Sequence, residues 1–421
     1  MAGRFGNYNG SGSQARINWE VKFAKGGVGA ILSSFCPVTI AGRILPNYAA
    51  IDSDDRIPFW RKLGEAVHQH DCPYILQLSH SGRQQDVRGI ENLLNRALSS
   101  TDQREPFHGI LCKAMTTEQV RETIQLFANA ARRAREAGLD GVELHSANGY
   151  LFTQFLSSAI NDRKDEYGGS LENRARFLLE VIRAVRKEVG RDYHFQAKIS
   201  AVEYDNALVP TNKPGNRLED SIQVCKWAEE AGIDAIHVST GSSFPHPLNP
   251  FGDGDFPFEH ATRAYPILLP EGEDTHRNYR LIRSPLLRPL FSQLWERVKK
   301  GKEIEGVSVA DASAIKKAVG IPVIVTGGFQ GASYIRRIIE NGDVDGVSIA
   351  RALIANNDLT RRFAQGEDMP DRPCTHCNKC MVYASVHPLG CYEDSRFDSY
   401  DEMIAEVMSV FDPPGDWIIP P

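Results

Sequence analysis

Residues 141–177, GVELHSANGYLFTQFLSSAINDRKDEYGGSLENRARF, hold the candidate catalytic residues of this chain. The first residues of this stretch alternate in polarity after a glycine at position 138, which predicts a buried strand that ends at His145. Asn148 and Tyr150 follow closely, and Gly149 permits a tight turn between them. Polar side chains directly after a strand are typical of the active sites of parallel β/α barrels.

His145, Asn148 and Tyr150 are therefore the candidate catalytic residues. A histidine and an asparagine can both donate hydrogen bonds to one carbonyl oxygen and polarise it. A tyrosine phenol can then supply a proton to a developing carbanion. On these residues alone, the alternative that His145 and Asn148 only satisfy loop backbone groups stays open.

Length and composition narrow the class of protein. A chain of 421 residues has room for one large α/β barrel or for two smaller domains. The net charge of -6 provides no basic surface for nucleic acid. No apolar run is long enough to span a bilayer, and the N-terminal residues lack the apolar core of a signal peptide. We therefore expect a cytoplasmic protein with a small-molecule substrate and neither a nucleic-acid nor a membrane partner.

From residue 20 onward, short apolar runs alternate with amphipathic helical stretches, which predicts repeated β-α units around a parallel sheet. The expected strands are 29–35, 74–78, 142–145, 194–200, 235–239, 321–326 and 345–349. The main expected helices are 57–69, 116–138 with a capping box at Thr116 and Gln119, 171–189, 218–231, 331–340 and 352–364. Seven strands are one fewer than a (β/α)₈ TIM barrel needs. The residues ahead of Trp19 suit a loop, so the predicted barrel lacks its first strand.

The domain organisation follows from two departures from this repeat. Residues 241–306 form an oversized insertion with one expected helix at 287–300, of the kind that becomes a lid or an interface. The barrel pattern stops after Ala364. We expect residues 1–370 to form the barrel domain and residues 371–421 to form a cysteine-containing extension with a last helix at 402–411.

Two polar residues inside the expected barrel are candidate cofactor contacts. Gln77 ends a strand, and its amide can both donate to and accept from a flat heterocycle, although buried glutamines are often structural. Lys198 lies near the end of another strand, where it would be an unpaired buried cation in an empty barrel. A cofactor atom that carries negative charge, such as N1 or O2 of a flavin, would relieve that cost.

The last two strands are followed by a candidate phosphate site. Gly327 and Gly328 follow one strand, and Ala350 and Arg351 follow the next. In many barrels these two loops present backbone N–H groups to a phosphate, which glycine allows to approach closely. Arg351 adds a charged fork to the same site.

Four of the eight cysteines form a group in the tail: Cys374, Cys377, Cys380 and Cys391. Four thiolates at this spacing suit an iron–sulfur cluster or a zinc site, and His376 and His387 are alternative zinc ligands. Four reduced thiols in a structured tail are the third alternative. The four scattered cysteines are expected to be small buried side chains.

The central stretch HSANGYLFTQFLSSAINDRKDEYGGSLENRARF closely resembles the old yellow enzyme family of FMN-dependent NAD(P)H:flavin oxidoreductases. The segments QLSHSGRQ, PVIVTGGF and DGVSIARALIANNDL match that family in the same order, so that the likeness covers about residues 20–360. The tail resembles the cluster-binding segment of the trimethylamine dehydrogenase and dienoyl-CoA reductase branch.

The resemblance implies an FMN-binding barrel that NADH or NADPH reduces and that passes hydride to an α,β-unsaturated carbonyl compound. It implies that His145 and Asn148 bind the substrate carbonyl and that Tyr150 protonates the α-carbon. It also implies flavin contacts from Gln77 and Lys198, a phosphate site at Gly327, Gly328, Ala350 and Arg351, and a 4Fe-4S cluster at the four tail cysteines.

Three hypotheses about function follow. The first is an ene-reductase, the second is an iron–sulfur flavoprotein that exchanges electrons with a partner protein, and the third is a truncated or inactive barrel that does not hold flavin. The third rests only on the missing first strand. The sequence does not distinguish NADH from NADPH, and it leaves a homo-oligomer and an electron-transfer partner as open alternatives.

Overall fold

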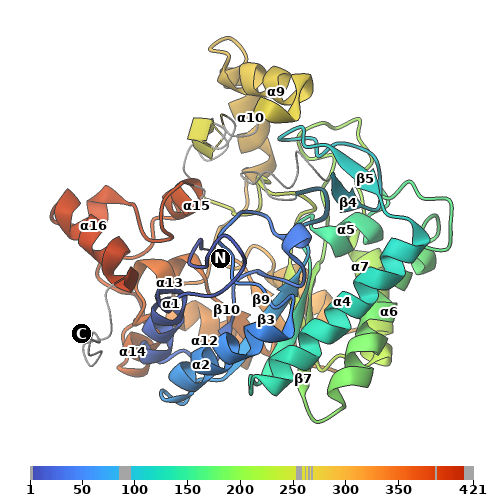
Figure 1. Ribbon diagram of the computed structural model, residues 1–421. Coiled ribbons are helices and arrows are strands. Elements are labelled where there is room, and N and C mark those ends of the chain that lie inside the picture. The colour runs from blue at the N-terminus through green and yellow to red at the C-terminus, as the bar shows by residue number, and fades with distance from the viewer. Residues whose placement is uncertain are drawn as a thin grey trace.

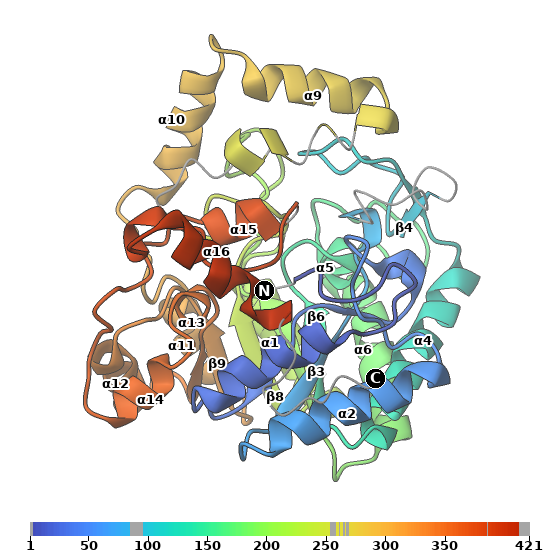
Figure 2. The same cartoon turned by 60° about the vertical axis from the view of Figure 1, so that its left-hand side comes forward.

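The computed structural model describes residues 3–84, 96–252, 258–260, 262, 263, 266, 269–384 and 386–411. A parallel sheet forms its centre, with strands in the order β1-β3-β6-β7-β8-β9-β10 and with β2 paired to β3. Figures 1 and 2 show these strands in the middle of the molecule with helices packed around them. The strands of this sheet are β1 (Ile31–Leu32), β2 (Cys36–Pro37), β3 (Tyr74–Ser79), β6 (Gly141–Ser146), β7 (His194–Ser200), β8 (Ala235–Ser239), β9 (Val323–Thr326) and β10 (Gly346–Ser348).

The helices between the strands have the amphipathic spacing and the caps that the sequence predicts. The Thr116 hydroxyl accepts from the backbone N–H of Gln119, whose side chain returns to the Thr116 backbone and completes the capping box. The helices are α1 (Gln14–Lys25), α2 (Ile57–His68), α4 (Thr117–Glu136), α5 (Leu151–Leu156), α6 (Leu171–Val189), α7 (Leu218–Ala231), α9 (Glu273–Arg283), α10 (Arg288–Lys299), α11 (Val309–Lys316), α12 (Ala332–Glu340), α13 (Arg351–Ala355), α14 (Leu359–Ala364), α15 (Lys379–Ala384) and α16 (Tyr400–Met408).

The sheet is open between β10 and β1, the two ends of its strand order. Among the described residues no strand precedes α1, so the prediction of an α/β barrel that lacks its first strand is confirmed. The expected loop before Trp19 is wrong in part, because α1 begins at Gln14 with the Ser13 side chain as its cap. The first predicted strand, 29–35, is shorter than expected, since only Ile31–Leu32 pairs with β3 before a turn leads to β2.

Three other predictions need correction. The expected helix 352–364 is two helices, α13 and α14, with Asn356 in an extended conformation after the first. The connection after β3 contains a small parallel sheet of β4 (Ala97–Ser99) and β5 (Cys112–Ala114), which local patterns did not indicate. The insertion holds α9 in addition to the expected α10, and both helices project from one end of the barrel (Figures 1 and 2).

The tail lies against the first helix of the chain. Asn18 of α1 donates from Nδ2 to the backbone oxygen of Val410 at 2.9 Å, and Lys22 forms an ion pair with Glu406 of α16. Segments from the two ends of the sequence are therefore joined at the open side of the sheet. None of the described helices has the length and the apolar character that a membrane crossing requires.

Candidate active site

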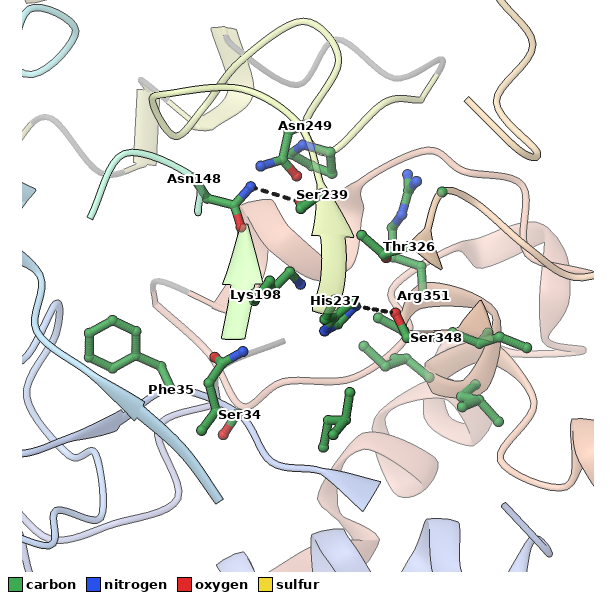
Figure 3. A pocket seen from close by; sticks show the side chains of 18 of the residues that line it. Ser34, Phe35, Asn148, Lys198, His237, Ser239, Asn249, Thr326, Ser348 and Arg351 are labelled. Carbon is green, nitrogen blue, oxygen red and sulfur yellow. Dashed lines mark hydrogen bonds between the residues drawn. The ribbon is translucent and has the colours of Figure 1, made fainter. Parts of the chain in front are cut away.

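A cavity of about 690 Å³ lies at the carboxyl ends of the strands. It is lined by residues from every strand of the sheet except β2 and by the insertion. Figure 3 shows side chains around it from β7 and β8 and from the ends of β9 and β10, where Thr326 and Ser348 lie. It extends to the open side of the sheet, where Trp19 and Phe23 of α1 and Val347 of β10 line it. All of the predicted catalytic and cofactor-binding residues lie on its wall: Gln77, His145, Asn148, Tyr150, Lys198, Gly327, Gly328, Ala350 and Arg351.

His145 and Tyr150 face the same part of this cavity. Their ring centres are 4.8 Å apart with an angle of 70° between the rings, and both side chains are buried. The Nδ1 atom of His145 is buried and has no hydrogen-bond partner among the described residues, which is costly unless a ligand supplies one. Burial raises the pKa of Tyr150 far above its ordinary value, so that the phenol keeps its proton.

Asn148 is held by its neighbours more firmly than the sequence indicates. Its backbone lies in the left-handed region, with φ of 62°, and its N–H donates to Oγ of Ser200 at 3.2 Å. Its side-chain Nδ2 donates to Oγ of Ser239 at 3.1 Å (Figure 3) and to the carbonyl oxygen of Thr240, also at 3.1 Å. Because both amide hydrogens are engaged, Asn148 can donate to a ligand only after one of these bonds breaks.

A buried polar layer below the cavity was missed by the sequence reasoning. Glu143, fully buried, accepts from Nε2 of Gln77 at 2.6 Å and from Nδ1 of His237 at 2.8 Å. Gln196 donates to the same carboxylate, and Nε2 of His237 contacts Oγ of Ser348 at 2.7 Å. The two-residue repeat of a β-strand could have predicted this position. Glu143 lies two residues before His145, so both side chains point to the same face of β6.

The charge of this layer is fixed by its surroundings. Burial alone would raise the pKa of Glu143, but His237, Lys198 and the amide of Gln77 outweigh it and lower the pKa to about 2. The carboxylate is therefore ionised at neutral pH. Gln77 consequently has its amide N–H₂ turned toward Glu143, although its side chain still lines the cavity.

Lys198 is the cation of this region. Burial lowers its pKa, and the negative charge of Glu143 opposes this effect. No carboxylate of the described residues lies within ion-pair distance of its Nζ, and Figure 3 shows the side chain between β7 and β8 at the cavity. An anionic ligand atom would relieve the desolvation of this ammonium group, as the sequence reasoning anticipated.

The other end of the cavity has the character of a phosphate site. Gly327, Gly328, Ala350 and Arg351 lie together on one wall. Gly328 has φ of 71°, and a Cβ there would approach the carbonyl oxygen of Ile304 to 2.5 Å, so that only glycine fits. These backbone groups and the guanidinium are the donor set that suits a phosphate monoester.

The four tail thiols are neighbours. Desolvation raises the pKa of Cys380 to about 12, and the other three thiols of the group act on it electrostatically. Arg396 donates to Sγ of Cys391 at 3.1 Å, and the backbone N–H of His376 donates to Sγ of Cys374 at 3.4 Å. Such N–H···S bonds are typical of thiolates that bind a cluster.

The tail shows no preformed site for a metal ion among the described residues. Among them, no three His, Cys, Asp or Glu side chains converge closely enough to hold one metal ion. Nε2 of His376 contacts the carbonyl oxygen of Gly328, and the ring of His387 packs near that of Tyr383. The assignment of the four thiols to a cluster, to a zinc ion or to no metal therefore stays a prediction.

The scattered cysteines are Cys36, Cys72, Cys112 and Cys225, and all four are buried. Their prediction as small core side chains is confirmed.

The comparisons with known proteins identify the family and the fold. The model of the NADH:flavin oxidoreductase / NADH oxidase family matches residues 6–259. The chain is 33% identical over 379 residues to an NADH oxidase from Thermoanaerobacter brockii, a match that covers 90% of this chain and 50% of that protein. It is 38% identical over 240 residues to an NADPH dehydrogenase from Halalkalibacterium halodurans, covering 57% of this chain and 66% of that protein.

A solved structure of similar fold is the old yellow enzyme homologue from Zymomonas mobilis. It superposes with a TM-score of 0.63 at 19% identity, and the match covers 91% of this chain and 92% of that chain. This likeness shows the fold. The chain spans about half to two thirds of the length of the two curated relatives described above.

Proposed function

Because the chain belongs to the NADH:flavin oxidoreductase / NADH oxidase family, we propose that it is an FMN-dependent NAD(P)H oxidoreductase that reduces the C=C bond of α,β-unsaturated carbonyl compounds. The observation that carries this proposal is the buried, unpartnered Nδ1 of His145 beside the protonated phenol of Tyr150. Both side chains line a cavity that also holds the half-buried Lys198 and a glycine-rich candidate phosphate site.

The residues of the cavity fit FMN. Lys198 suits the electron-rich side of an isoalloxazine ring, and Gly327, Gly328 and Arg351 suit its phosphate. Bound FMN would supply hydride transfer from NADH or NADPH to the substrate. The residues of this chain then have two tasks, which are to hold the carbonyl oxygen and to deliver a proton.

His145 performs the first task by donating a hydrogen bond to the carbonyl oxygen, where negative charge develops. Asn148 joins it when the substrate oxygen replaces Ser239 or Thr240 as acceptor of its amide. Tyr150 performs the second task by protonating the α-carbon. Phe35, whose ring centre lies 5.2 Å from that of Tyr150, belongs to the apolar cluster that keeps water from this phenol.

Two half-reactions test this proposal. The protein is reconstituted with FMN, reduced anaerobically with NADH or NADPH, and mixed with 2-cyclohexen-1-one while flavin absorbance is recorded. We expect reduction by a nicotinamide and fast reoxidation by the enone. A protein that takes up no FMN, or whose reduced flavin is not reoxidised by any conjugated enone, contradicts the proposal.

A second candidate function is that of an iron–sulfur flavoprotein that exchanges electrons with a partner protein. The four neighbouring thiols and the donors to Cys374 and Cys391 favour it. Iron and acid-labile sulfide are measured after anaerobic purification, with Cys377→Ser as the test and Cys72→Ser as the control. Stoichiometric iron that only Cys377→Ser removes supports this function, and wild-type protein without iron after anaerobic cluster reconstitution contradicts it.

A further inference from the structure

We propose that His376 and Asn378 position the phosphate-binding groups of the cavity, so that FMN affinity depends on the folded state of the cysteine loop, residues 374–380. This inference rests on the proposed function for the identity of the ligand. It assigns a positioning role to His376 and Asn378, the two residues that flank Cys377.

Asn378 connects the cysteine loop to Arg351. Its Oδ1 accepts a hydrogen bond from Nη1 of Arg351 at 2.6 Å, and its Nδ2 donates to the carbonyl oxygen of Pro250 at 3.2 Å. Only 2% of the Asn378 side chain is exposed, so the amide cannot rotate away without leaving polar atoms unsatisfied. Arg351 lines the cavity (Figure 3), and its hydrogen bond to Asn378 restrains the orientation of the guanidinium.

His376 connects the same loop to the glycine turn. Its Nε2 lies 3.2 Å from the carbonyl oxygen of Gly328, so the ring donates from this nitrogen. The turn at Gly328 presents its backbone to the cavity in a conformation that glycine alone adopts without strain. The hydrogen bond fixes this turn, and His376 itself is buried at the cavity wall.

The insertion also contacts the cysteine loop, next to its bonds with Arg351 and Gly328. A Cβ at Gly252 would lie 2.1 Å from the carbonyl oxygen of His376 and 2.7 Å from Nδ2 of Asn378. The phosphate loops, the insertion and the cysteine loop are therefore packed in direct contact. A shift of the cysteine loop is transmitted to the phosphate site because the close packing leaves no room to absorb it.

The conformation of the loop itself needs support. His376 and Asn378 both lie in the left-handed backbone region, with φ of 55° and 63°. Asparagine and histidine adopt this region more readily than most residues, but every residue other than glycine does so at a cost, so we expect a loop released from its restraints to relax toward ordinary φ values. A group bound by the four tail thiols around Cys380 would restrain this loop and hold both residues in place.

Such coupling is reciprocal. If a metal group on the thiols raises the affinity for FMN, bound FMN must raise the affinity for the metal group by the same factor. The structure thus predicts a flavoprotein whose cofactor affinity reports the state of its cysteine loop. It also predicts that each group protects the other from loss.

The first experiment measures FMN affinity. Flavin-free protein is titrated with FMN by flavin fluorescence, for wild type, Asn378→Ala, His376→Ala and the control Lys379→Ala. Lys379 lies in the same loop but pairs with Glu393 and Asp394 on the outside. We expect about a tenfold or larger loss of affinity in Asn378→Ala and a smaller loss in His376→Ala, because a hydrogen bond to a charged group contributes more than one to a neutral group.

Metal content and thermal unfolding are measured on every variant, so that a loss of folding or of metal is separated from a loss of positioning. The second experiment follows release of the tail metal, iron or added zinc, to a chelator with and without FMN. FMN should slow this release in wild type and not in Asn378→Ala.

Wild-type protein that binds FMN, with Asn378→Ala and His376→Ala equal to Lys379→Ala in affinity, overturns this inference and leaves the proposed function intact. FMN that leaves metal release unchanged in wild type also overturns it. Wild-type protein that binds no FMN overturns the proposed function and this inference together.

Discussion

The phenol ring of Tyr150 meets the imidazole of His145 edge to face, with 4.8 Å between ring centres, on the wall of one cavity. The two residues come from different elements, since His145 lies in β6 and Tyr150 caps α5. Their separation lets one hold an oxygen atom while the other reaches a nearby carbon. The proposed roles can be distinguished because oxidation of the reduced flavin by an enone needs a proton, whereas reduction of the flavin by NADH or NADPH needs none from Tyr150.

We expect Tyr150→Phe to slow oxidation of the reduced flavin by 2-cyclohexen-1-one by about a hundredfold or more, the size of a general-acid contribution. Reduction by NADH or NADPH needs no proton from this phenol and should change little. Stopped-flow absorbance of the two half-reactions measures both rates.

The matched control is Tyr193→Phe, which removes another buried phenol oxygen that has no hydrogen-bond partner among the described residues. It should leave both half-reactions unchanged. Equal slowing of the two half-reactions in Tyr150→Phe would remove the proton-donor role.

Replacing Lys198 by methionine should separate stability from cofactor binding. The apolar side chain removes the desolvation of the ammonium group but also its attraction to the ionised Glu143, so the free energy of unfolding of the flavin-free protein should change by less than about 1 kcal/mol. FMN affinity should fall at least tenfold, because the cation that faces the electron-rich side of the ring is lost. Urea unfolding and FMN titration measure the two effects.

Lys299→Met is the contrasting variant. Lys299 is buried, and its Nζ binds the carbonyl oxygen of Gly252 at 2.9 Å and Glu296 at 2.6 Å, so its removal should destabilise the protein. If Lys198→Met lowers the stability as much as Lys299→Met does, Lys198 has a structural role and not a cofactor-binding role.

Gly328→Ala should weaken FMN binding through the phosphate turn. The substitution meets the strain of a positive φ and a contact of 2.5 Å with the carbonyl oxygen of Ile304. Gly342→Ala is the matched control, because its φ of 74° is similar and a Cβ there meets nothing within 4 Å. Gly342→Ala should lower the free energy of unfolding by about 1 kcal/mol and leave FMN affinity unchanged. Gly328→Ala should lower the free energy of unfolding by about 2–3 kcal/mol and FMN affinity at least tenfold.

Thermal unfolding and FMN titration of the two alanine variants supply the comparison. A Gly328→Ala protein with the same FMN affinity as Gly342→Ala would show that this turn does not contribute to the phosphate site.

Much of the fold could be predicted because the hydrophobic periodicity that marks each helix and strand is a local property of the sequence. Helices α6 and α7 and strands β7 and β8 have the predicted bounds, since each has a clear period and most end at a glycine or a polar cluster. The residues of the cavity wall could be predicted because the carboxyl ends of parallel strands converge at one edge. The missing first strand also followed from a count of these units.

The rest depends on contacts between distant segments. Glu143 bonds to residues that lie on β3, β7 and β8, and no local pattern indicates that a carboxylate will find three donors. The bonds of His376 and Asn378 to Gly328 and Arg351 join the tail to the end of the barrel. Local sequence predicted the cysteine group, but only the folded chain shows what that group touches.

The ionised Glu143 should make the stability of the protein depend on pH in the acid range. Its pKa in the folded protein is about 2, below the ordinary value of about 4.3 for a glutamate in an unfolded chain. A carboxyl group with a lowered pKa contributes stability that is fully present above the ordinary value and is lost as pH falls through the folded value. The free energy of unfolding should therefore fall by about 3 kcal/mol between pH 5 and pH 2 on account of this group.

Urea unfolding of the flavin-free protein across this range should show a shallower decline in stability for Glu143→Gln than for wild type. The variant should also be less stable than wild type at pH 7, because the amide replaces an acceptor of three hydrogen bonds. The exposed Glu188→Gln should follow wild type throughout, and a Glu143→Gln profile parallel to wild type would place the acid sensitivity elsewhere in the protein.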